Sequence, residues 1–405
     1  MNITLLRSWW NSRTRWERGA IAVWCAILLV VSVRVFLEPA KRTVYPIFSG
    51  SAQLWWSGAD LYEPHRPDTV QGGYRYSPTL AILVTPFAVF PDSVGGVLWR
   101  LVSTAALLRA LAWLAHSVLP FALSKNQFAW LTLLCVPLTM QSLNNGQANM
   151  LVIAAMLGTM AAVREQRWNL ACALMTLAFV CKVYPLALGM LLVMLYPRQL
   201  LVRMALAIVI SLLVPLVMQH PEYVFDQYGR WAALLRADDR TNTEMENKHR
   251  DLWLLIDLYG LPISRRFYTL LQILSGVGIA AVCWIRQRQG WSQKALLTST
   301  LALAVAWMLL LGPVVESSTF LLLAPSLACS VLAVMRNGVW RWRLLLLGGS
   351  AGLFVLAALL GGIANTAKLN IIGLHPWASL LYFTYLLTEP QPAAAESSLM
   401  VRRAA

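Results

Sequence analysis

The sequence has few charged residues. Only 13% of its 405 residues are Asp, Glu, Lys or Arg, and 58% are hydrophobic. Soluble globular proteins carry about 25% charged residues. This balance excludes an ordinary soluble domain and indicates a polytopic membrane protein.

Cysteine and histidine are also scarce. The six cysteines all fall inside apolar segments: Cys25, Cys135, Cys172, Cys181, Cys283 and Cys329. They therefore offer neither a disulfide framework nor a CxxC metal motif. The five histidines show no metal-ligand spacing: His65, His116, His220, His249 and His375. We therefore expect no metal, no cofactor and no zinc chemistry.

Long apolar segments dominate the rest of the chain. Segments of about 17 to 25 apolar residues can cross the hydrocarbon core as helices. The candidates are 18–37, 94–116, 128–142, 147–163, 168–181, 183–197, 203–218, 266–285, 295–312, 318–335, 344–362 and 373–388. Each is apolar all round, which favours helices over barrel strands. The prediction is an all-α polytopic membrane protein, a bundle of about 12 transmembrane helices formed by one domain over residues 1–388, with a disordered cytoplasmic tail over 389–405.

The net charge of +15 comes from short basic clusters beside the apolar segments. The clusters are Arg7, Arg13, Arg15 and Arg18; Arg198 and Arg203; Arg286, Arg288 and Lys294; Arg336, Arg341 and Arg343; and Arg402 and Arg403. This positive-inside pattern predicts a cytoplasmic N-terminus, with segment 18–37 kept as an anchor. No basic stripe with interleaved aromatics lies elsewhere, so we expect no nucleic-acid partner.

Two long polar inserts, 38–76 and 219–264, contain twelve of the eighteen carboxylates. Both fall on the external side of the predicted topology. Residues 49–58 suit an amphipathic helix with Trp55 and Trp56 at headgroup depth, and Gly58 would end it. The layout is typical of an enzyme that works at a membrane surface.

Segment 77–91 is the weakest apolar stretch, because Pro78, Pro86 and Pro91 interrupt its helical pattern. We interpret it as re-entrant or surface-lying, which makes the number of crossings agree with a cytoplasmic Arg164 and Arg167. If it crosses instead, the amides at 144–149 move to the inner face.

Polar residues at the predicted external ends of the spans are candidate site residues. Tyr74, Arg75 and Tyr76 precede an apolar stretch, and Arg can bind a phosphate through two parallel hydrogen bonds. The alternative is an aromatic belt with a snorkelling arginine. Asn145, Gln147 and Asn149 lie between two apolar segments, where amides suit sugar hydroxyls. The alternative for these amides is helix capping.

The remaining candidates are charged groups. Lys182, followed by Tyr184, lies between two apolar runs with no adjacent acid and suits a lipid phosphate; the alternative is a lysine that snorkels to the interface. Glu316 is the only carboxylate between residues 258 and 388, and a helix cap is the alternative. His249, Arg250 and Asp251 form a polar cluster that could order over a ligand or remain a solvated loop.

Four motifs occur together in one order: Gly58-Ala-Asp-Leu-Tyr62, Tyr74-Arg-Tyr-Ser-Pro78 with Pro86, Asn145-Gly-Gln-Ala-Asn149 and Lys182-Val-Tyr-Pro185. With these motifs the chain resembles glycosyltransferase family 87, whose members are membrane enzymes of the GT-C fold. The resemblance covers about residues 42–330.

This resemblance implies a hexosyltransferase that acts with inversion and little or no metal dependence. It implies transfer of a hexose or pentose, mannose favoured, from a polyprenyl-phosphate donor to a hydroxyl of a lipid or glycan acceptor, on the external face of the inner or plasma membrane. Donor, acceptor and membrane lipids are then the expected partners.

The chain departs from the family pattern in one respect. The family places an Asp ahead of the Gly-x-Asp-Leu-Tyr element as the base, and here no carboxylate lies between Glu38 and Asp60. We expect Asp60 to be the base, with Glu316 and Asp251 as alternatives. Phosphate partners would be Arg75 and Lys182. Sugar and site contacts would come from Tyr62, Tyr74, Tyr76, Asn145, Gln147, Asn149, Tyr184, His249 and Arg250.

Two other functions use similar residues. A transporter or flippase of lipid-linked sugars also binds a polyprenyl phosphate, but such proteins carry internal repeats, and none is visible. A non-catalytic relative would explain the missing Asp.

Overall fold

The computed structural model describes residues 3–62, 73–237, 248–312, 315–363 and 372–390. The predicted disordered tail from residue 391 onward lies outside these residues, as do the central parts of both polar inserts.

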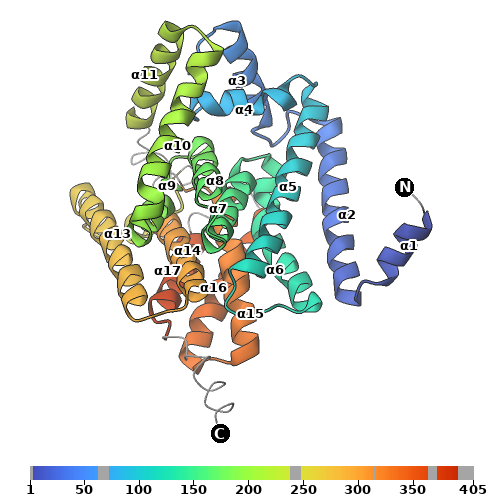
Figure 1. The fold of residues 1–405 in the computed structure, drawn as a ribbon, viewed down its shortest axis with the longest axis vertical. Helices are drawn as coiled ribbons and strands as arrows, with labels where there is room; N and C mark the ends of the chain where they lie inside the picture. The colour runs from blue at the N-terminus through green and yellow to red at the C-terminus, as the bar shows by residue number, and fades with distance from the viewer. Residues whose placement is uncertain (1–2, 63–72, 238–247, 313–314, 364–371, 391–405) are drawn as a thin grey trace.

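All regular structure in the described residues is helical (Figure 1), which confirms the all-α prediction. In chain order the helices are α1 (Ile3–Asn11), α2 (Arg15–Leu37), α3 (Tyr45–Ser57), α4 (Pro78–Ala88), α5 (Asp92–Ser117), α6 (Lys125–Asn145), α7 (Asn149–Arg164), α8 (Trp168–Cys181), α9 (Leu186–Leu195), α10 (Pro197–Met218), α11 (Pro221–Ala237), α12 (Leu252–Leu258), α13 (Arg265–Arg288), α14 (Gln293–Leu310), the 3₁₀ helix η2 (Ser317–Leu323), α15 (Ala324–Asn337), α16 (Arg341–Ile363) and α17 (Leu374–Leu387).

Local sequence sets several helix ends. Thr14 caps α2 and Ser124 caps α6, each through a capping box that is completed by Glu17 or Gln127. These boxes satisfy backbone N–H groups that the first turn of a helix leaves without partners. At the other end of α6, Gly146 takes a left-handed conformation with φ 67°, which glycine adopts without steric cost.

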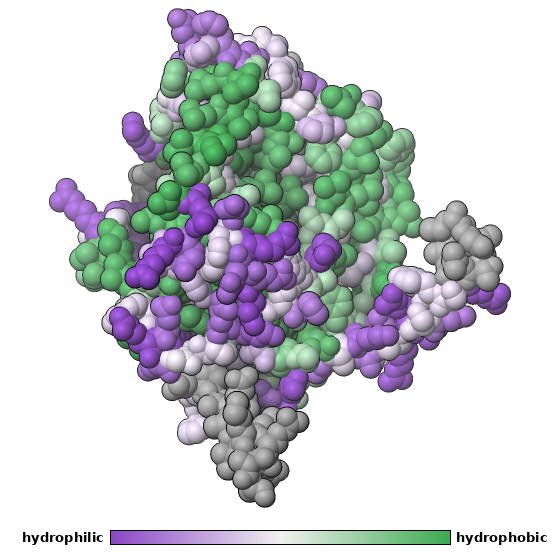
Figure 2. Space-filling model, in the orientation of Figure 1, coloured by the Kyte–Doolittle hydropathy of each residue, from purple (hydrophilic) through white to green (hydrophobic). Residues whose placement is uncertain are grey.

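The helices form a core surrounded by an apolar outer layer. Nearly every residue of α7 and α14 is buried, and α7 lies near the centre of the bundle (Figure 1). By contrast, α2, α10, α13 and α16 turn large apolar side chains outward, among them Val30, Val217 and Ile273. The face in Figure 2 shows broad green areas accordingly. An exposed apolar surface of this kind needs lipid to cover it.

Seven described segments are long and apolar enough to cross a membrane. They are α2, α5, α10, α13, α14, the combined η2 and α15 segment, and α16. The chain is thus an integral multi-pass membrane protein. The central helices α7, α8 and α9 are shorter, so the structure does not reproduce twelve full-length spans. The 16 residues of α7 extend about 24 Å, less than the roughly 30 Å hydrocarbon core, but α7 is surrounded by protein.

The proline-rich segment 77–91 forms a helix, α4, although its prolines predicted an interruption. Pro78 occupies the first turn, where its missing N–H costs nothing, and Pro86 falls near the end. At 11 residues, α4 extends only about 16 Å. It lies with α3 at one end of the bundle (Figure 1). This position fits the surface-lying interpretation.

The predicted interfacial helix in the first insert exists as α3, but the prediction for Trp55 was wrong. Trp55 is fully buried, with its ring 5.4 Å from that of Tyr223 on α11. Trp56 is 47% exposed and donates its indole N–H to Thr85 Oγ1 at 2.9 Å. The second insert covers one face of α3, so only one of the two tryptophans reaches the surface.

Close packing of α5 against α3 and α4 depends on Gly95. A Cβ added there would overlap the Phe87 carbonyl oxygen and the Tyr45 hydroxyl. We expect Gly95→Ala to lower the unfolding free energy by about 1–3 kcal/mol, measured as the denaturation midpoint in detergent micelles. Gly50→Ala in α3 is the control, because nothing lies within 4 Å of its added Cβ. Equal midpoints for the two variants would contradict this packing.

Candidate active site

Glu316 lies where the second insert meets the end of α14. It directly precedes η2, and its backbone N–H donates to Thr319 Oγ1 at 3.3 Å. The preceding carbonyl, that of Val315, accepts the backbone N–H of Arg250 at 2.8 Å. Glu316 therefore occupies the helix-cap position considered for it, and the same backbone pairing brings Arg250 beside it.

The charge of Glu316 acts on four neighbours that lie outside the helices. Burial raises the pKa values of Tyr76 and Tyr184, and the Glu316 carboxylate raises both further. Burial lowers the pKa of Arg250 to about 10 and also lowers the pKa of Lys182, and in both cases Glu316 opposes the shift. Two phenols and two cations from three separate segments thus lie within the influence of one carboxylate.

Two polar groups near Glu316 have hydrogen-bonding capacity left for a ligand. The Lys182 ammonium makes no hydrogen bond to any described residue, and it lies 5.7 Å from the ring centre of Tyr184. The buried Tyr184 hydroxyl likewise lacks a partner among the described residues. Buried polar groups normally have partners, so the Tyr184 hydroxyl, with the half-buried Lys182 beside it, marks a candidate place for a polar ligand.

The predicted amide site joins this group. Tyr76 donates its hydroxyl to Gln147 Oε1 at 3.0 Å, and Asn149 donates Nδ2 to Ser318 O at 2.9 Å. Asn149 is fully buried, and its Oδ1 has no partner among the described residues. We call Tyr76, Gln147, Lys182, Tyr184, Arg250 and Glu316 the Glu316 cluster.

Aromatic packing positions Tyr76. The Tyr62 hydroxyl donates to Tyr76 O at 2.7 Å, and the ring of Tyr74 lies 5.7 Å from those of both Tyr62 and Tyr76. Arg75 O accepts the indole N–H of Trp231 on α11 at 3.3 Å, while the charge of Arg75 opposes the rise in the Tyr76 pKa. Arg75 is thus close to the cluster.

Asp60, the first choice for the base, lies in a different setting. Its Oδ1 accepts the backbone N–H of Tyr62 at 2.9 Å, and its Oδ2 pairs with Arg230 of α11 at 3.0 Å. Arg230 also pairs with Asp226 at 2.7 Å. These contacts tie the Gly58–Tyr62 element to α11 and engage both oxygens of Asp60.

Asp251 directly follows Arg250 but interacts with α13. Burial raises its pKa from 3.8 to about 6, against the opposing charge of Arg265. Tyr268 on α13 is the other neighbour that its charge influences. His249, on the other side of Arg250, is half-buried. The two neighbours Arg250 and Asp251 therefore serve different parts of the structure.

Sequence reasoning missed the groups that hold the amides in place. Arg34, Thr43, Trp99 and Arg100 all donate to carbonyls at the end of α6. The signal was present, because Arg100 is a charged residue inside an apolar segment, and such residues are functional candidates by default.

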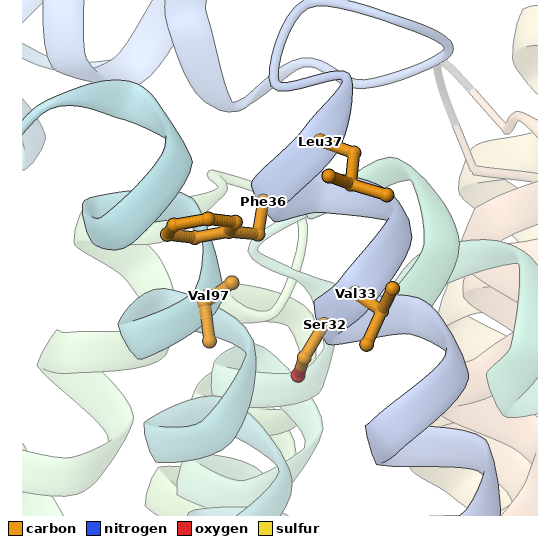
Figure 3. Close-up of a pocket in the computed structure, with 5 residues that line it drawn as sticks. All are labelled: Ser32, Val33, Phe36, Leu37 and Val97. Atoms are coloured by element: carbon orange, nitrogen blue, oxygen red, sulfur yellow. The ribbon is translucent and has the colours of Figure 1, made fainter.

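A shallow groove of about 270 Å³ opens between α2 and α5 (Figure 3). It is lined by Ser32, Val33, Phe36, Leu37 and Val97. Its lining is apolar except for Ser32, and it includes no residue of the Glu316 cluster. Such a groove suits a hydrocarbon chain, and its lining offers no group for catalysis.

The described residues contain no group of three His, Cys, Asp or Glu side chains that could hold a metal ion. The cations of the Glu316 cluster are the positive charges available to an anionic ligand there.

The family model of glycosyltransferase family 87 matches residues 74–313, more than half of the chain. The chain belongs to glycosyltransferase family 87. It is therefore a membrane glycosyltransferase, as the resemblance indicated. The matched region includes Tyr76, Gln147, Lys182 and Arg250 of the cluster and ends just before Glu316.

Two solved structures are similar to this family 87 chain. ArnT from Cupriavidus metallidurans bound to undecaprenyl phosphate aligns with a TM-score of 0.45 and 16% identity, over 91% of this chain and 78% of that one. The same protein in the apo state gives 0.43 and 14% over the same shares. No curated protein matches the chain.

The raised pKa of Asp251 predicts a pH effect on stability. The folded state holds this proton more tightly than the unfolded state, so stability falls as pH rises from about 4 to 6. Asp251→Asn should remove this loss and raise the unfolding free energy above pH 6 by about 2–3 kcal/mol, and the unfolding temperature with it. Thermal scans from pH 4 to 8 test it. A variant that follows the wild-type curve throughout would contradict the assignment.

Proposed function

We propose that this family 87 enzyme transfers a hexose or pentose, mannose favoured, from a polyprenyl-phosphate donor to a hydroxyl of a lipid or glycan acceptor. Glu316 would be the general base. The observation that carries this is one carboxylate whose charge acts on two cations and two phenols, near the buried amides Gln147 and Asn149. That combination matches the needs of sugar transfer from a phosphate leaving group.

In this reaction the Glu316 carboxylate takes the proton from the acceptor hydroxyl. The acceptor oxygen bonds to C1 of the sugar as the bond between C1 and the phosphate oxygen breaks. Polyprenyl phosphate leaves with the electron pair, and Lys182 and Arg250, with Arg75 nearby, stabilise its added negative charge. A single displacement of this kind inverts the configuration at C1.

The amides and phenols give the site its preference for a sugar. The Asn149 Oδ1 and the Tyr184 hydroxyl lack partners among the described residues and can bond to hydroxyls of the donor sugar. Gln147 fixes Tyr76 through its hydrogen bond. Asn145, half-exposed at the end of α6, can contact the sugar from the same turn.

Glu316 is a better candidate for the base than the other two carboxylates. Asp60 uses both oxygens for the backbone of Tyr62 and for Arg230, so proton transfer would disturb the docking of α11. Asp251 interacts with Arg265 and Tyr268. Glu316 alone of these three influences Lys182, Tyr76 and Tyr184.

We assign the end of the bundle with α3, α4 and α11 to the external face of the inner or plasma membrane. The opposite end holds the start of α2 and the end of α15 (Figure 1), which carry Arg15, Arg18 and Arg336. Positive residues gather on the cytoplasmic side, so this assignment leaves the N-terminus inside.

Replacing Glu316 tests the base. We expect Glu316→Gln to lower turnover at least about 100-fold and to leave binding of undecaprenyl phosphate within about threefold, since the amide keeps shape but cannot take a proton. The assay is sugar transfer from polyprenyl-phosphate mannose. Asp60→Asn, which weakens the α11 contact, should retain most turnover.

The opposite ranking would reject Glu316 and restore Asp60 as the base. Tight lipid binding with no transfer by the wild-type protein would favour a flippase or a non-catalytic relative.

Lys182 tests the phosphate contact. Lys182→Met keeps the apolar stem and removes the charge, so we expect undecaprenyl phosphate to bind about tenfold or more weakly. Lys125→Met is the control, because Lys125 is exposed at the start of α6. Equal affinities in fluorescence titrations of the two variants would remove Lys182 from the site.

A further inference from the structure

The end of α6 is capped by donors from far along the chain. The last carbonyls of a helix have no partner within it. Leu143 O accepts a hydrogen bond from Arg100 Nε at 2.9 Å, and Asn144 O accepts from Arg34 Nη2 at 2.7 Å and from Arg100 Nη2 at 2.9 Å. Asn145 O accepts from Val44 N at 2.8 Å and from Thr43 Oγ1 at 3.0 Å. Gly146 O accepts from Trp99 Nε1 at 2.9 Å. Four consecutive carbonyls are thereby fixed.

Arg100 is the centre of this arrangement. Its side chain is 0% exposed, and its guanidinium also donates to Gly96 O at 2.9 Å and Thr43 Oγ1 at 2.8 Å. No carboxylate pairs with it among the described residues. Its charge is compensated by carbonyl dipoles at the negative end of α6. Arg100 therefore links α5, α6 and the segment before α3.

Gly146 leaves space for this guanidinium. A Cβ at Gly146 would lie 2.7 Å from Arg100 Nη2 and 2.9 Å from Arg100 Cζ. The residue thus needs to be glycine both for its positive φ and to leave space for the guanidinium.

We propose that Arg100 is a positioning residue for donor binding, acting through the turn that carries Gln147 and Asn149. Because these carbonyls are fixed, α6 ends at a defined place, and the positions of the residues that follow it are defined as well. From there Gln147 meets Tyr76, and Asn149 meets Ser318 beside Glu316. The inference rests on the proposed function, since the ligand it serves is the polyprenyl-phosphate sugar.

Lysine cannot replace Arg100 in this role. Four acceptors on three segments are reached by a planar group with five N–H donors. An ammonium has three donors at one point, so some carbonyls would lose their partners, and the turn would gain freedom.

The experiment compares Arg100→Lys with Arg109→Lys, an exposed arginine on the same helix. We expect Arg100→Lys to bind undecaprenyl phosphate about tenfold more weakly and to raise KM more than it lowers kcat, since it acts on binding geometry. Amide hydrogen exchange over residues 143–149 should rise. Arg109→Lys should change neither.

A second pair tests the same contact from the other side. Gly146→Ala should reproduce the weaker binding. Gly338→Ala should not, because Gly338 has the same φ of 67° and nothing within 4 Å of an added Cβ. This comparison separates the loss of the Arg100 contact from the general effect of placing a side chain at a positive φ.

A double-mutant cycle distinguishes positioning from general support of the fold. Arg100→Lys combined with Gln147→Ala should weaken binding several-fold less than the product of the single effects. Should Arg100→Lys fail to fold, Thr43→Val replaces it in the cycle. This change removes the hydroxyl that accepts from Arg100 and donates to Asn145 O, together with its bond from the Tyr45 N–H.

The positioning role is overturned if folded Arg100→Lys or Thr43→Val binds the lipid like the wild type, or if its effect multiplies independently with that of Gln147→Ala. Failure of the proposed function looks different. In that case the wild type and Lys182→Met would bind undecaprenyl phosphate equally poorly. The positioning role toward that donor would then be rejected too, even if amide exchange over residues 143–149 rises in Arg100→Lys.

Discussion

The site depends on how a helix can end inside an apolar bundle. The C-terminal end of each helix exposes backbone carbonyls that water can satisfy in a soluble protein. Where α6 gives way to α7, side chains of α2 and α5 and the segment before α3 supply the donors instead. All of these lie earlier in the chain than α6, so the part of the chain up to α5 holds the amide turn in place.

The three candidate carboxylates show how environment separates residues that look alike in sequence. Asp60 is engaged in docking α11, and Asp251 faces α13 with a raised pKa. Glu316 faces cations and phenols that come from three other segments. All three side chains are carboxylates with the same formal charge. Only the neighbours that folding brings to each one distinguish a structural acid from a candidate base.

The sequence predicted the elements better than the contacts between them. Apolar composition was enough for an all-α membrane fold, and motif spacing was enough for the family. The environments of single residues depend on tertiary packing and were not predictable in the same way. The local sequence around Trp55 is typical of an interfacial tryptophan, yet Trp55 packs against Tyr223 of α11. The grouping of Tyr76, Lys182 and Glu316 joins residues over a hundred positions apart. No local sequence pattern encodes contacts over such separations. The proline-rich segment 77–91 is a separate case, because it forms the helix α4 although its prolines predicted an interruption.

Three cations that are buried or half-buried in this protein differ in which groups compensate their charge, and this difference bears on function. Arg286 is buried against Glu389 at 3.3 Å and Leu386 O at 2.8 Å, which ties α13 to the end of α17. Arg100 is compensated by carbonyls alone, with its donors largely used. The half-buried Lys182 side chain makes no hydrogen bond to a described residue; its neighbours include the Tyr184 ring and the charge of Glu316. A partly desolvated cation whose donors are unused gains most from a bound anion, so among these three Lys182 is the one that favours an anionic ligand.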